Sequence, residues 1–261
     1  MKNFNFKTAT NSKEATKLIS GRATFLAGGM TLLPAIKLRL AAYSDLINIK
    51  KIKNLSGIKI SSKSIRIGAT TTHAAVASSK EVGKSIPSLA ILAEGIGDPQ
   101  VRNRGTLGGS IANNDPAADY PSACVALNST IHTNKRKILA DKFFKGMFET
   151  DLKKGELIEA IEFEVPEKSA YAKFPNPASR YAVVGVYIAK FKKEVRVAIT
   201  GAASCVFRSK ELETALSNNF TSSAIDNINI SSNGFNEDIH ASAEYRAHII
   251  KVMAKKAVSS C

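Results

Sequence analysis

Two glycine pairs, Gly28-Gly29 and Gly108-Gly109, constrain the fold of this chain more than any other feature of its sequence. Glycine has no Cβ, so it enters tight turns and lets a backbone approach a ligand closely. The first pair interrupts ATFLAGGMTLLPAIKLRLA, residues 23–41, where a short apolar run is followed by apolar residues at helical spacing. This pattern predicts a strand, a tight turn and a helix.

The second pair lies in the polar segment 97–116, which we predict to be a long loop without secondary structure of its own. Loops of this length in compact domains are more often functional than idle. Both pairs can turn successive backbone N–H groups toward an anion, and two such loops would suit a pyrophosphate. Neither pair matches a P-loop or GxGxxG, and each taken alone is more often a structural turn.

The rest of the chain predicts an α+β protein with two parts. Strands are expected at 45–49, 64–72 and 156–166, helical structure over 72–95 with a break at Pro87, and a short helix over 117–128. After a polar junction at 166–169, three strands are expected at 170–174, 180–191 and 194–204. A final helix is expected over 240–258, with one apolar face formed by Ala243, Ala247, Ile250, Val252 and Ala254.

Asp115 and Asp119 flank Pro116 where the helix over 117–128 is expected to begin. A carboxylate at this point could accept hydrogen bonds from ribose or ribityl hydroxyl groups. Asp115 is more simply explained as the cap of the helix, with Pro116 at its first position. Asp119 is not needed as a cap, so it is the better candidate for a ligand.

The sequence contains no pattern typical of a metal site or of a catalytic side chain. Cys124, Cys205 and Cys261 lie far apart, which predicts neither a disulfide framework nor a cysteine-bound metal or iron–sulfur cluster. The four histidines are scattered without a ligand pair. A nucleophile elbow and a Ser-His-Asp order are also missing, so a cofactor would have to carry any chemistry.

Charge and hydropathy limit the partners. The formal net charge is +15, but the lysines are spread along the chain and aromatic residues are not interleaved with them. We therefore expect acidic partners or a phosphate-bearing cofactor rather than nucleic acid. No window contains the roughly 18 apolar residues of a membrane span, and the N-terminus lacks the apolar core of a secretory signal. These features predict a cytoplasmic protein without a transmembrane segment.

Four segments occur in an order that is typical of one family. They are LAGGMTLLPAIK (26–37), GDPQVRNRGTLGGSIANNDPAADYP (97–121), FPNPASRYAVVGV (174–186) and HASAEYRAHI (240–249). With them the chain resembles the FAD-binding medium subunit of molybdenum hydroxylases, most closely the medium chain of aerobic-type carbon monoxide dehydrogenase. The FAD domain of xanthine dehydrogenase is a more distant relative. The resemblance covers nearly the whole chain.

The resemblance implies a fold and a domain organisation. It implies an FAD-binding domain at 1–168, of the type found in vanillyl-alcohol oxidase and p-cresol methylhydroxylase, made of two α+β subdomains that divide near 55–60. It implies a C-terminal α+β domain at 169–261, with a three-stranded antiparallel sheet and helices. The cysteine-rich insertion of the related hydroxybenzoyl-CoA reductase subunit has no counterpart, so this chain should hold flavin alone.

The resemblance also implies the residues that bind FAD. The first glycine loop of the family matches Ala27 to Thr31, and the second matches Thr106 to Ser110; together they would hold the pyrophosphate through backbone N–H groups. Met30 stands where relatives often carry a polar residue, so the resemblance implies a contact through its backbone N–H. The predicted cofactor-binding residues are Leu26, Ala27, Gly28, Gly29, Met30, Thr31, Thr106, Leu107, Gly108, Gly109, Ser110, Asp119, Ile158 and Lys173.

The function implied is that of an oxidoreductase subunit in a heterotrimer, which in turn would pair into a dimer. A large subunit would hold the molybdenum cofactor and a small subunit two [2Fe–2S] clusters, and FAD on this chain would pass electrons to quinone, NAD or oxygen. A location in the cytoplasm, including the inner face of the cytoplasmic membrane, fits this role. Two alternatives stay open: a flavin-free assembly or nucleotide-binding subunit of the same fold, and a nucleic-acid binder driven by the charge.

Overall fold

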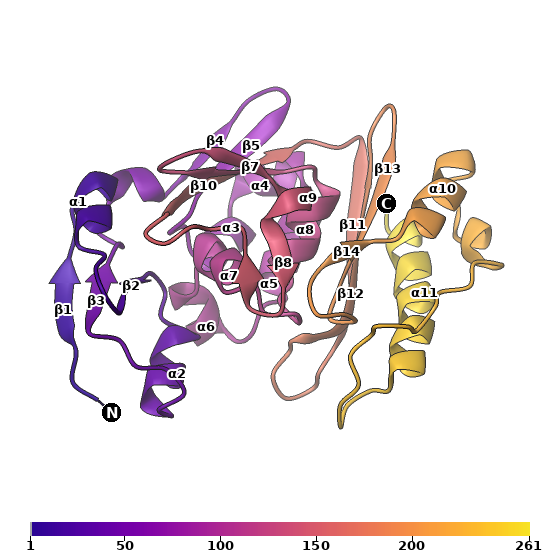
Figure 1. The fold of residues 1–261 in the computed structure, drawn as a ribbon. Coiled ribbons are helices and arrows are strands. Elements are labelled where there is room, and N and C mark those ends of the chain that lie inside the picture. The colour runs from indigo at the N-terminus through magenta and orange to yellow at the C-terminus, as the bar shows by residue number, and fades with distance from the viewer. Residues whose placement is uncertain (1) are drawn as a thin grey trace.

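The computed structural model describes residues 2–261 as three sheets that follow one another along the molecule (Figure 1). The first is a parallel sheet of β1 (Asn5–Thr8), β3 (Asp45–Asn48) and β2 (Ala23–Leu26), in that order. Helices α1 (Ser12–Lys17) and α2 (Leu32–Lys37) connect its strands. Asn11 caps α1 by accepting a hydrogen bond from the N–H of Glu14, whose carboxylate accepts one from the N–H of Thr10. This reciprocal cap fixes the start of the first helix.

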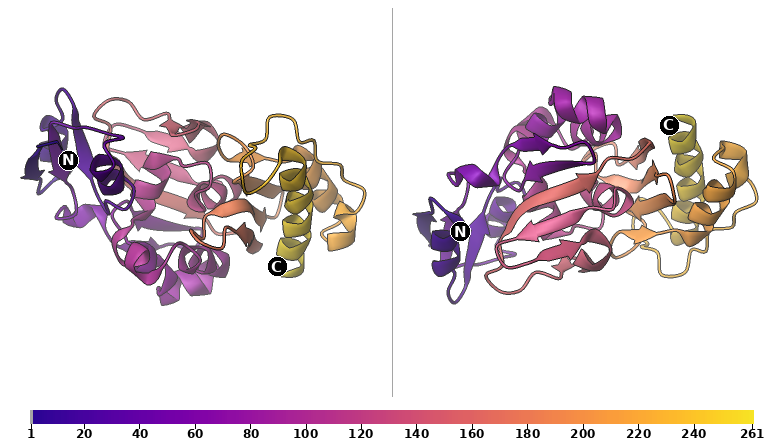
Figure 2. Two further views of the ribbon diagram at one scale, coloured as in Figure 1. Left: turned by 90° about the horizontal axis from the view of Figure 1, so that it is seen from below. Right: turned by 90° about the horizontal axis from the view of Figure 1, so that it is seen from above.

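The second sheet is antiparallel, in the order β4-β5-β10-β6-β7. Its strands are β4 (Ile58–Ile60), β5 (Ser64–Gly68), β10 (Ile158–Glu164), β6 (Thr130–Thr133) and β7 (Lys137–Leu139). The strands alternate: Ile65 and Ile67 are fully buried, whereas Arg66 between them lies on the other face. Helices cover the buried face (Figure 2): α3 (His73–Ala77), α4 (Lys80–Ser85), α5 (Pro87–Glu94), α6 (Pro99–Arg104), α7 (Leu107–Asn113) and α8 (Tyr120–Ala126).

The third sheet is also antiparallel and contains β11 (Lys168–Pro175), β12 (Ala182–Lys190), β13 (Val195–Thr200) and β14 (Phe207–Arg208). Helices α10 (Lys210–Asn218) and α11 (Ala243–Ser259) cover its outer face, while its inner face packs on α5 and α8. On β12, Val186 and Ile188 therefore join the outer cluster of buried residues, and Tyr187 and Ala189 join the inner one. Burial on both faces explains why this strand is apolar along its length.

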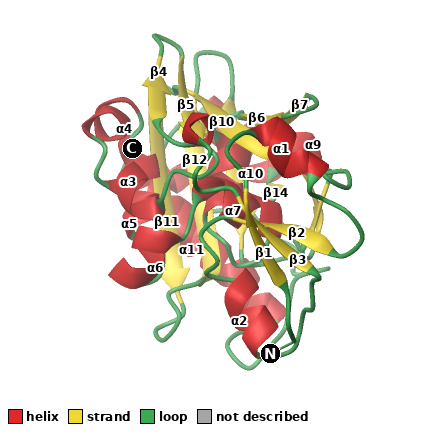
Figure 3. Ribbon diagram, turned by 90° about the vertical axis from the view of Figure 1, so that its left-hand side faces the viewer, coloured by secondary structure: helices red, strands yellow, loops and turns green. Residues whose placement is uncertain are grey.

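Smaller elements complete the chain. They are the 3-10 helices η1 (Lys53–Leu55) and η2 (Ser222–Ile225), helix α9 (Ala140–Phe143), and a hairpin of β8 (Phe144–Gly146) and β9 (Glu149–Thr150). Viewed from the side of the first sheet, β1, β2 and β3 lie in front of the helical layer (Figure 3). Within residues 2–261, no helix combines the length and the apolar character needed to cross a membrane.

The predicted α+β class is confirmed, together with the C-terminal antiparallel sheet and its long final helix. The sheet has one short strand, β14, beyond the three predicted, because Phe207–Arg208 pairs with the edge of β13. On α11, Ala247, Ile250 and Ala254 are buried as predicted, but Val252 is 40% exposed. The buried face instead continues through Met253 and Ala257, which keep the helical spacing.

The prediction of a long unstructured loop over 97–116 is wrong, because this segment contains α6 and α7. Asp98 caps α6 by accepting a hydrogen bond from the N–H of Val101, and Pro99 occupies its first position. Thr106 caps α7 in the same way, through the N–H of Gly109. Both helices are short, and glycines and polar residues hide their apolar spacing in the sequence.

The expected start of the helix over 117–128 is also wrong. Helix α8 begins at Tyr120, and Asp119 rather than Asp115 occupies the residue before it. The side chain of Asp115 accepts a hydrogen bond from the N–H of Ala117, two residues later, at 2.9 Å. This bond closes a tight side-chain-to-backbone turn. Asp115 therefore stabilises the approach to the helix and does not cap it.

Candidate functional site

A cavity of about 600 Å³ lies between the first sheet and the helical layer of the second. This volume is within the range of small-molecule sites in proteins. All but two of the predicted cofactor-binding residues line it; the exceptions are Leu107, which is fully buried in the core, and Lys173. The lining residues that were predicted are Leu26, Ala27, Gly28, Gly29, Met30, Thr31, Thr106, Gly108, Gly109, Ser110, Asp119 and Ile158.

The first glycine loop connects β2 to α2 and presents its backbone to the cavity. Gly29 has a φ of +77°, a conformation that favours glycine. Within residues 2–261, no acceptor is hydrogen-bonded to the backbone N–H groups of residues 28–32. Such a run of free N–H groups can bind an anion. Gly28 has a different role: a Cβ there would lie 2.3 Å from the carbonyl oxygen of Arg104, so the two glycine loops pack directly against each other.

The second glycine pair lies in the first turn of α7. Gly108 donates its N–H to the carbonyl oxygen of Ala69 at 2.8 Å, and a Cβ on Gly108 would lie 2.5 Å from the Cβ of Ala69. Gly109 donates to Oγ1 of Thr106 at 3.2 Å, and a Cβ on Gly109 would lie 2.8 Å from that side-chain oxygen, with no other atom within 4 Å. The first glycine of each pair is thus required for packing inside the protein. The free N–H groups that we expected from both loops are found at the first loop only. At the second loop the N–H groups of Gly108 and Gly109 are bonded within the protein, and Gly109 leaves the cavity wall without a side chain.

Asp119 is buried at the other end of the predicted site. Its carboxylate accepts hydrogen bonds from the hydroxyl of Tyr171 and from Nζ of Lys173, which lies 3.0 Å from Oδ1 and 3.2 Å from Oδ2. Burial raises the pKa of Asp119 above its usual range, although Lys173 and Tyr171 act in the opposite direction. Burial, followed by the charge of Asp119, also raises the pKa of Tyr171, which keeps this hydroxyl a donor. The carboxylate is therefore held in one orientation at the cavity wall.

Lys173 does not line the cavity, although we predicted a contact with the cofactor. Its ammonium group contacts the carbonyl oxygens of Gly95 and Arg180, each at 2.9 Å, as well as Asp119. Ile158, at the start of β10, does line the cavity and is 4% exposed. Of Ile158 and Lys173, the two residues predicted to bind the cofactor in the 156–173 region, only Ile158 lies in the cavity wall.

Several lining residues were not found from the sequence. His73 is buried behind the second loop, where burial, followed by the charge of Arg102, lowers its pKa to about 4. Glu156 is held by Arg136 through two hydrogen bonds of 2.9 and 3.0 Å. Burial raises the pKa of Glu156, but the bonds from Arg136, Lys153 and Thr133 outweigh it and lower the pKa to about 2. No local pattern marks these residues, because their partners lie far away in the sequence.

The cavity also receives residues from the C-terminal part of the chain. Ser179, Arg180 and Tyr181, in the connection between β11 and β12, form part of its wall. The cavity is thus built from four regions of the sequence: residues 24–49 with the first glycine loop, residues 69–119 with the helical layer, residues 152–158 up to the start of β10, and this connection. Within residues 2–261, no group of three or more His, Cys, Asp or Glu side chains is arranged to hold a metal ion. The site offers backbone donors, one oriented carboxylate and apolar walls to a ligand that carries phosphate.

The family described as "FAD binding domain in molybdopterin dehydrogenase" matches residues 2–167 of the chain. This range includes both glycine loops and Asp119. It ends just before β11, where the third sheet begins.

Relatives with known names match over nearly the whole chain. The glyceraldehyde dehydrogenase medium chain of Sulfolobus acidocaldarius is 34% identical, covering 97% of this chain and 96% of the relative. The carbon monoxide dehydrogenase medium chain of Hydrogenophaga pseudoflava is 33% identical, covering 91% and 88% respectively. A solved structure of carbon monoxide dehydrogenase from the same organism superimposes with a TM-score of 0.88 at 31% identity, over 99% of this chain and 96% of that one.

Proposed function

This chain belongs to the FAD-binding medium subunits of molybdenum hydroxylases, the carbon monoxide dehydrogenase and xanthine dehydrogenase family, and we propose that FAD binds in the cavity between its two glycine loops. As a member, it is an oxidoreductase subunit. The observation that carries the proposed site is the run of free N–H groups at residues 28–32, beside a wall where Gly109 leaves room for a ligand. A pyrophosphate would accept hydrogen bonds from these N–H groups and would occupy the space beside Gly109.

The remaining lining residues fit the other parts of FAD. Asp119 would accept hydrogen bonds from hydroxyl groups of the polyol, while Tyr171 and Lys173 hold its carboxylate. Leu26, Ala27 and Ile158 would provide apolar contacts. Met30 would contribute its N–H and an apolar side chain. We propose the N–H groups of residues 28–32 as the pyrophosphate donors, with Thr106 and Ser110 at the facing wall.

Bound FAD would supply the conversion of single electrons, received from iron–sulfur clusters of a partner, into a two-electron transfer to an external acceptor. This chain has no acid or base of its own in that scheme. Its residues bind and orient the cofactor, and the apolar wall limits access of water. We propose a small iron–sulfur subunit and a large molybdenum subunit as partners, in a cytoplasmic heterotrimer; the support is that relatives are named as medium chains of glyceraldehyde dehydrogenase and carbon monoxide dehydrogenase.

The substrate oxidised by the complex would be chosen by the large subunit. Support comes from the names of the relatives: medium chains of glyceraldehyde dehydrogenase and carbon monoxide dehydrogenase are 34% and 33% identical to this chain, although one name refers to a three-carbon hydroxyaldehyde and the other to a diatomic gas. FAD bound in this cavity would therefore carry out the electron transfer that these enzymes would share.

The flavin content of a matched pair of variants tests the site. Gly109→Asp places a negative charge and a side chain against the proposed pyrophosphate, whereas Gly83→Asp adds the same charge at an exposed glycine of α4 with open space around it. Gly108 is a poorer choice, because a Cβ there would lie 2.5 Å from the Cβ and 2.7 Å from the backbone oxygen of Ala69, whereas the one close atom at Gly109 is the side-chain Oγ1 of Thr106 at 2.8 Å. We expect the visible spectrum and released flavin to show stoichiometric FAD in the wild-type chain and in G83D, and almost none in G109D.

Two outcomes would contradict the proposal. Equal FAD content in G109D and G83D would remove the second glycine pair from the site. A wild-type chain that contains no FAD, even with its partner subunits and excess FAD, would favour a flavin-free assembly subunit of the same fold.

A further inference from the structure

We propose that Lys173 is a positioning residue that ties together three separate segments of the cavity wall, so that FAD binding and the order of the connection 176–181 are linked. The inference rests on the proposed function for its FAD readout. It differs from the expected role of Lys173 as a direct contact of the cofactor. It also gives the C-terminal sheet a part in forming the site.

The ammonium group of Lys173 lies where the three segments meet. Nζ donates to the carbonyl oxygen of Gly95, at 2.9 Å, and to that of Arg180, also at 2.9 Å, and it pairs with Asp119 at 3.0 Å. An ammonium group has three N–H donors, so these contacts use all of them. The side chain is 11% exposed and does not line the cavity. Lys173 therefore has no donor left for a ligand.

Each acceptor belongs to a segment that does line the cavity. Gly95 is followed by Ile96 and Gly97, which form part of the wall next to α6. The other two acceptors, Arg180 and Asp119, are lining residues themselves. One largely buried charge on β11 thus fixes wall segments at the end of α5, at the start of α8 and in the connection between β11 and β12.

Neighbouring contacts reinforce the same junction. Nη1 of Arg102 donates to the carbonyl oxygens of Ile96 and Gly97, each at 3.0 Å, and Nη1 of Arg180 donates to that of Gly97 at 3.2 Å. Arg180 also has a φ of +61°, in the left-handed region that non-glycine residues rarely adopt. Such a conformation persists when its surroundings hold it, and the bond from Lys173 to the Arg180 carbonyl is one of the contacts that do so.

Removal of Lys173 would take one donor from each of three acceptors. Two are the carbonyl oxygens of Gly95 and Arg180, and the third is a buried carboxylate that would keep only the hydroxyl of Tyr171. Loss of the charged partner of a buried carboxylate is unfavourable, and the exposed Arg180 would lose the bond that ties its segment to β11, so the three segments would move apart. Because the segments form one end of the cavity, their displacement would weaken FAD binding. By linkage, FAD that binds the ordered wall would in turn order the connection.

Limited trypsin digestion of the full chain tests the link, because Arg180 offers a cleavage site within the connection. The variants are Lys173→Met and, as the matched control, Lys168→Met, which removes an exposed lysine from the same strand. We expect added FAD to slow cleavage after Arg180 in the wild type and in K168M. In K173M, cleavage should be at least about tenfold faster without FAD, and FAD should bind at least about tenfold more weakly.

The outcomes separate this inference from the proposed function. Wild-type cleavage and FAD affinity in K173M would overturn the role of Lys173. Faster cleavage of K173M in a chain that never binds FAD would support the junction and contradict the FAD site. If K173M does not fold, hydrogen exchange of the 174–182 peptide in the wild-type chain still decides: slower exchange with FAD supports the link, and unchanged exchange overturns it.

Discussion

His73 shows how a single residue on the cavity wall connects folding to pH. It is 5% exposed, and its backbone N–H donates to the carbonyl oxygen of Gly105, which fixes the main chain of His73 behind the second glycine loop. Within residues 2–261, Nδ1 has no hydrogen-bond partner. Burial is the main reason that its pKa falls from 6.5 to about 4, and Arg102 adds to the effect. The ring is therefore neutral in the folded protein at neutral pH.

We predict that His73 makes the folded chain sensitive to moderate acid. Between pH 6.5 and about 4, His73 binds a proton in the unfolded chain but not in the folded chain. Its contribution to the free energy of unfolding is therefore fully present above this window and is lost as the pH decreases through it. The expected loss is on the order of 3 kcal/mol. Urea unfolding across this range should show a smaller dependence on pH in His73→Gln, whereas the same change at the exposed His248 should have no effect. An unchanged slope in H73Q would contradict the prediction.

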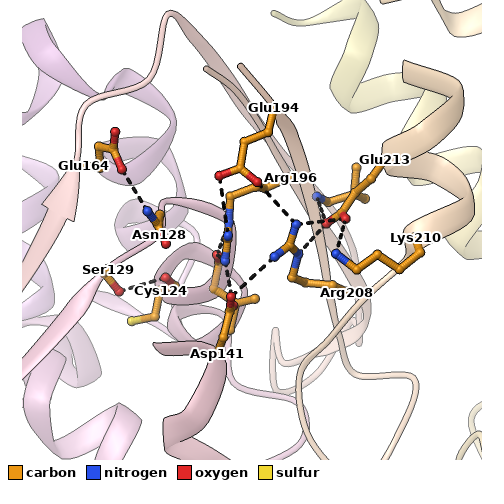
Figure 4. A network of polar contacts seen from close by, with 12 residues as sticks. Cys124, Asn128, Ser129, Asp141, Glu164, Glu194, Arg196, Arg208, Lys210 and Glu213 are labelled. Atoms are coloured by element: carbon orange, nitrogen blue, oxygen red, sulfur yellow. Dashed lines mark hydrogen bonds and ion pairs between the residues drawn. The ribbon is translucent and has the colours of Figure 1, made fainter. Parts of the chain in front are cut away.

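Among the elements, helix α8 is held at both ends by one strand, β13. At its start, Oγ1 of Thr200 donates to the carbonyl oxygen of Ala118 at 2.6 Å, next to Asp119. At its end, Arg196 donates to the carbonyl oxygen of Val125 from Nε at 3.0 Å and from Nη2 at 2.8 Å. Nη2 also contacts Asp141 at 2.6 Å, within the network of charges shown in Figure 4. A cation at the C-terminal end of a helix is favourable for the helix dipole as well.

We predict that Arg196→Met destabilises the whole protein, because it leaves the buried carbonyl oxygen of Val125 without these donors and Asp141 without its main partner. The expected loss of unfolding free energy is about 3 kcal/mol. Lys210→Met is a suitable control from the same network, since Lys210 is 70% exposed and its pair with Glu213 should contribute less than about 1 kcal/mol. Urea unfolding of the two variants measures the difference. Equal midpoints would show that Arg196 is not needed to hold α8.

On the scale of the whole molecule, the C-terminal sheet lies between two clusters of buried residues. Its inner face, with Tyr187, Ala189 and Ala198, belongs to the same cluster as the helices that border the cavity. Its outer face packs on α11 and α10. The N–H of Gly201 also donates to the carbonyl oxygen of Pro116 at 2.8 Å, in the segment that leads to Asp119. Although we predicted two domains that divide at 168, their cores are joined by direct packing.

We therefore predict that residues 1–168 and 169–261 unfold in one cooperative transition with FAD bound. The chain has no tryptophan, so flavin fluorescence would report the cavity, and far-UV circular dichroism would report all helices and sheets. The two thermal transitions should coincide. A second circular dichroism transition, occurring while FAD is still bound, would instead indicate a C-terminal domain that folds independently.

The sequence by itself determined the class of fold, the order of most elements and the family. Strand alternation, helical spacing and turn residues act over a few positions, so β12, α11 and the turn at Gly29 could be predicted locally. Most of the binding residues that the resemblance implied line the cavity, although they form only part of its wall. Short helices were missed over 97–116, because their capping side chains contribute more to the sequence pattern than their few apolar residues.

Only the tertiary structure decided what each site residue does. Gly28 packs against Arg104, and Gly108 against Ala69, so the glycines of each pair have different roles that no local pattern distinguishes. Lys173 contacts three wall segments and does not line the cavity. The physical reason is the same in each case: the partner is distant in the sequence, and burial and hydrogen bonding depend on which segments meet when the chain folds.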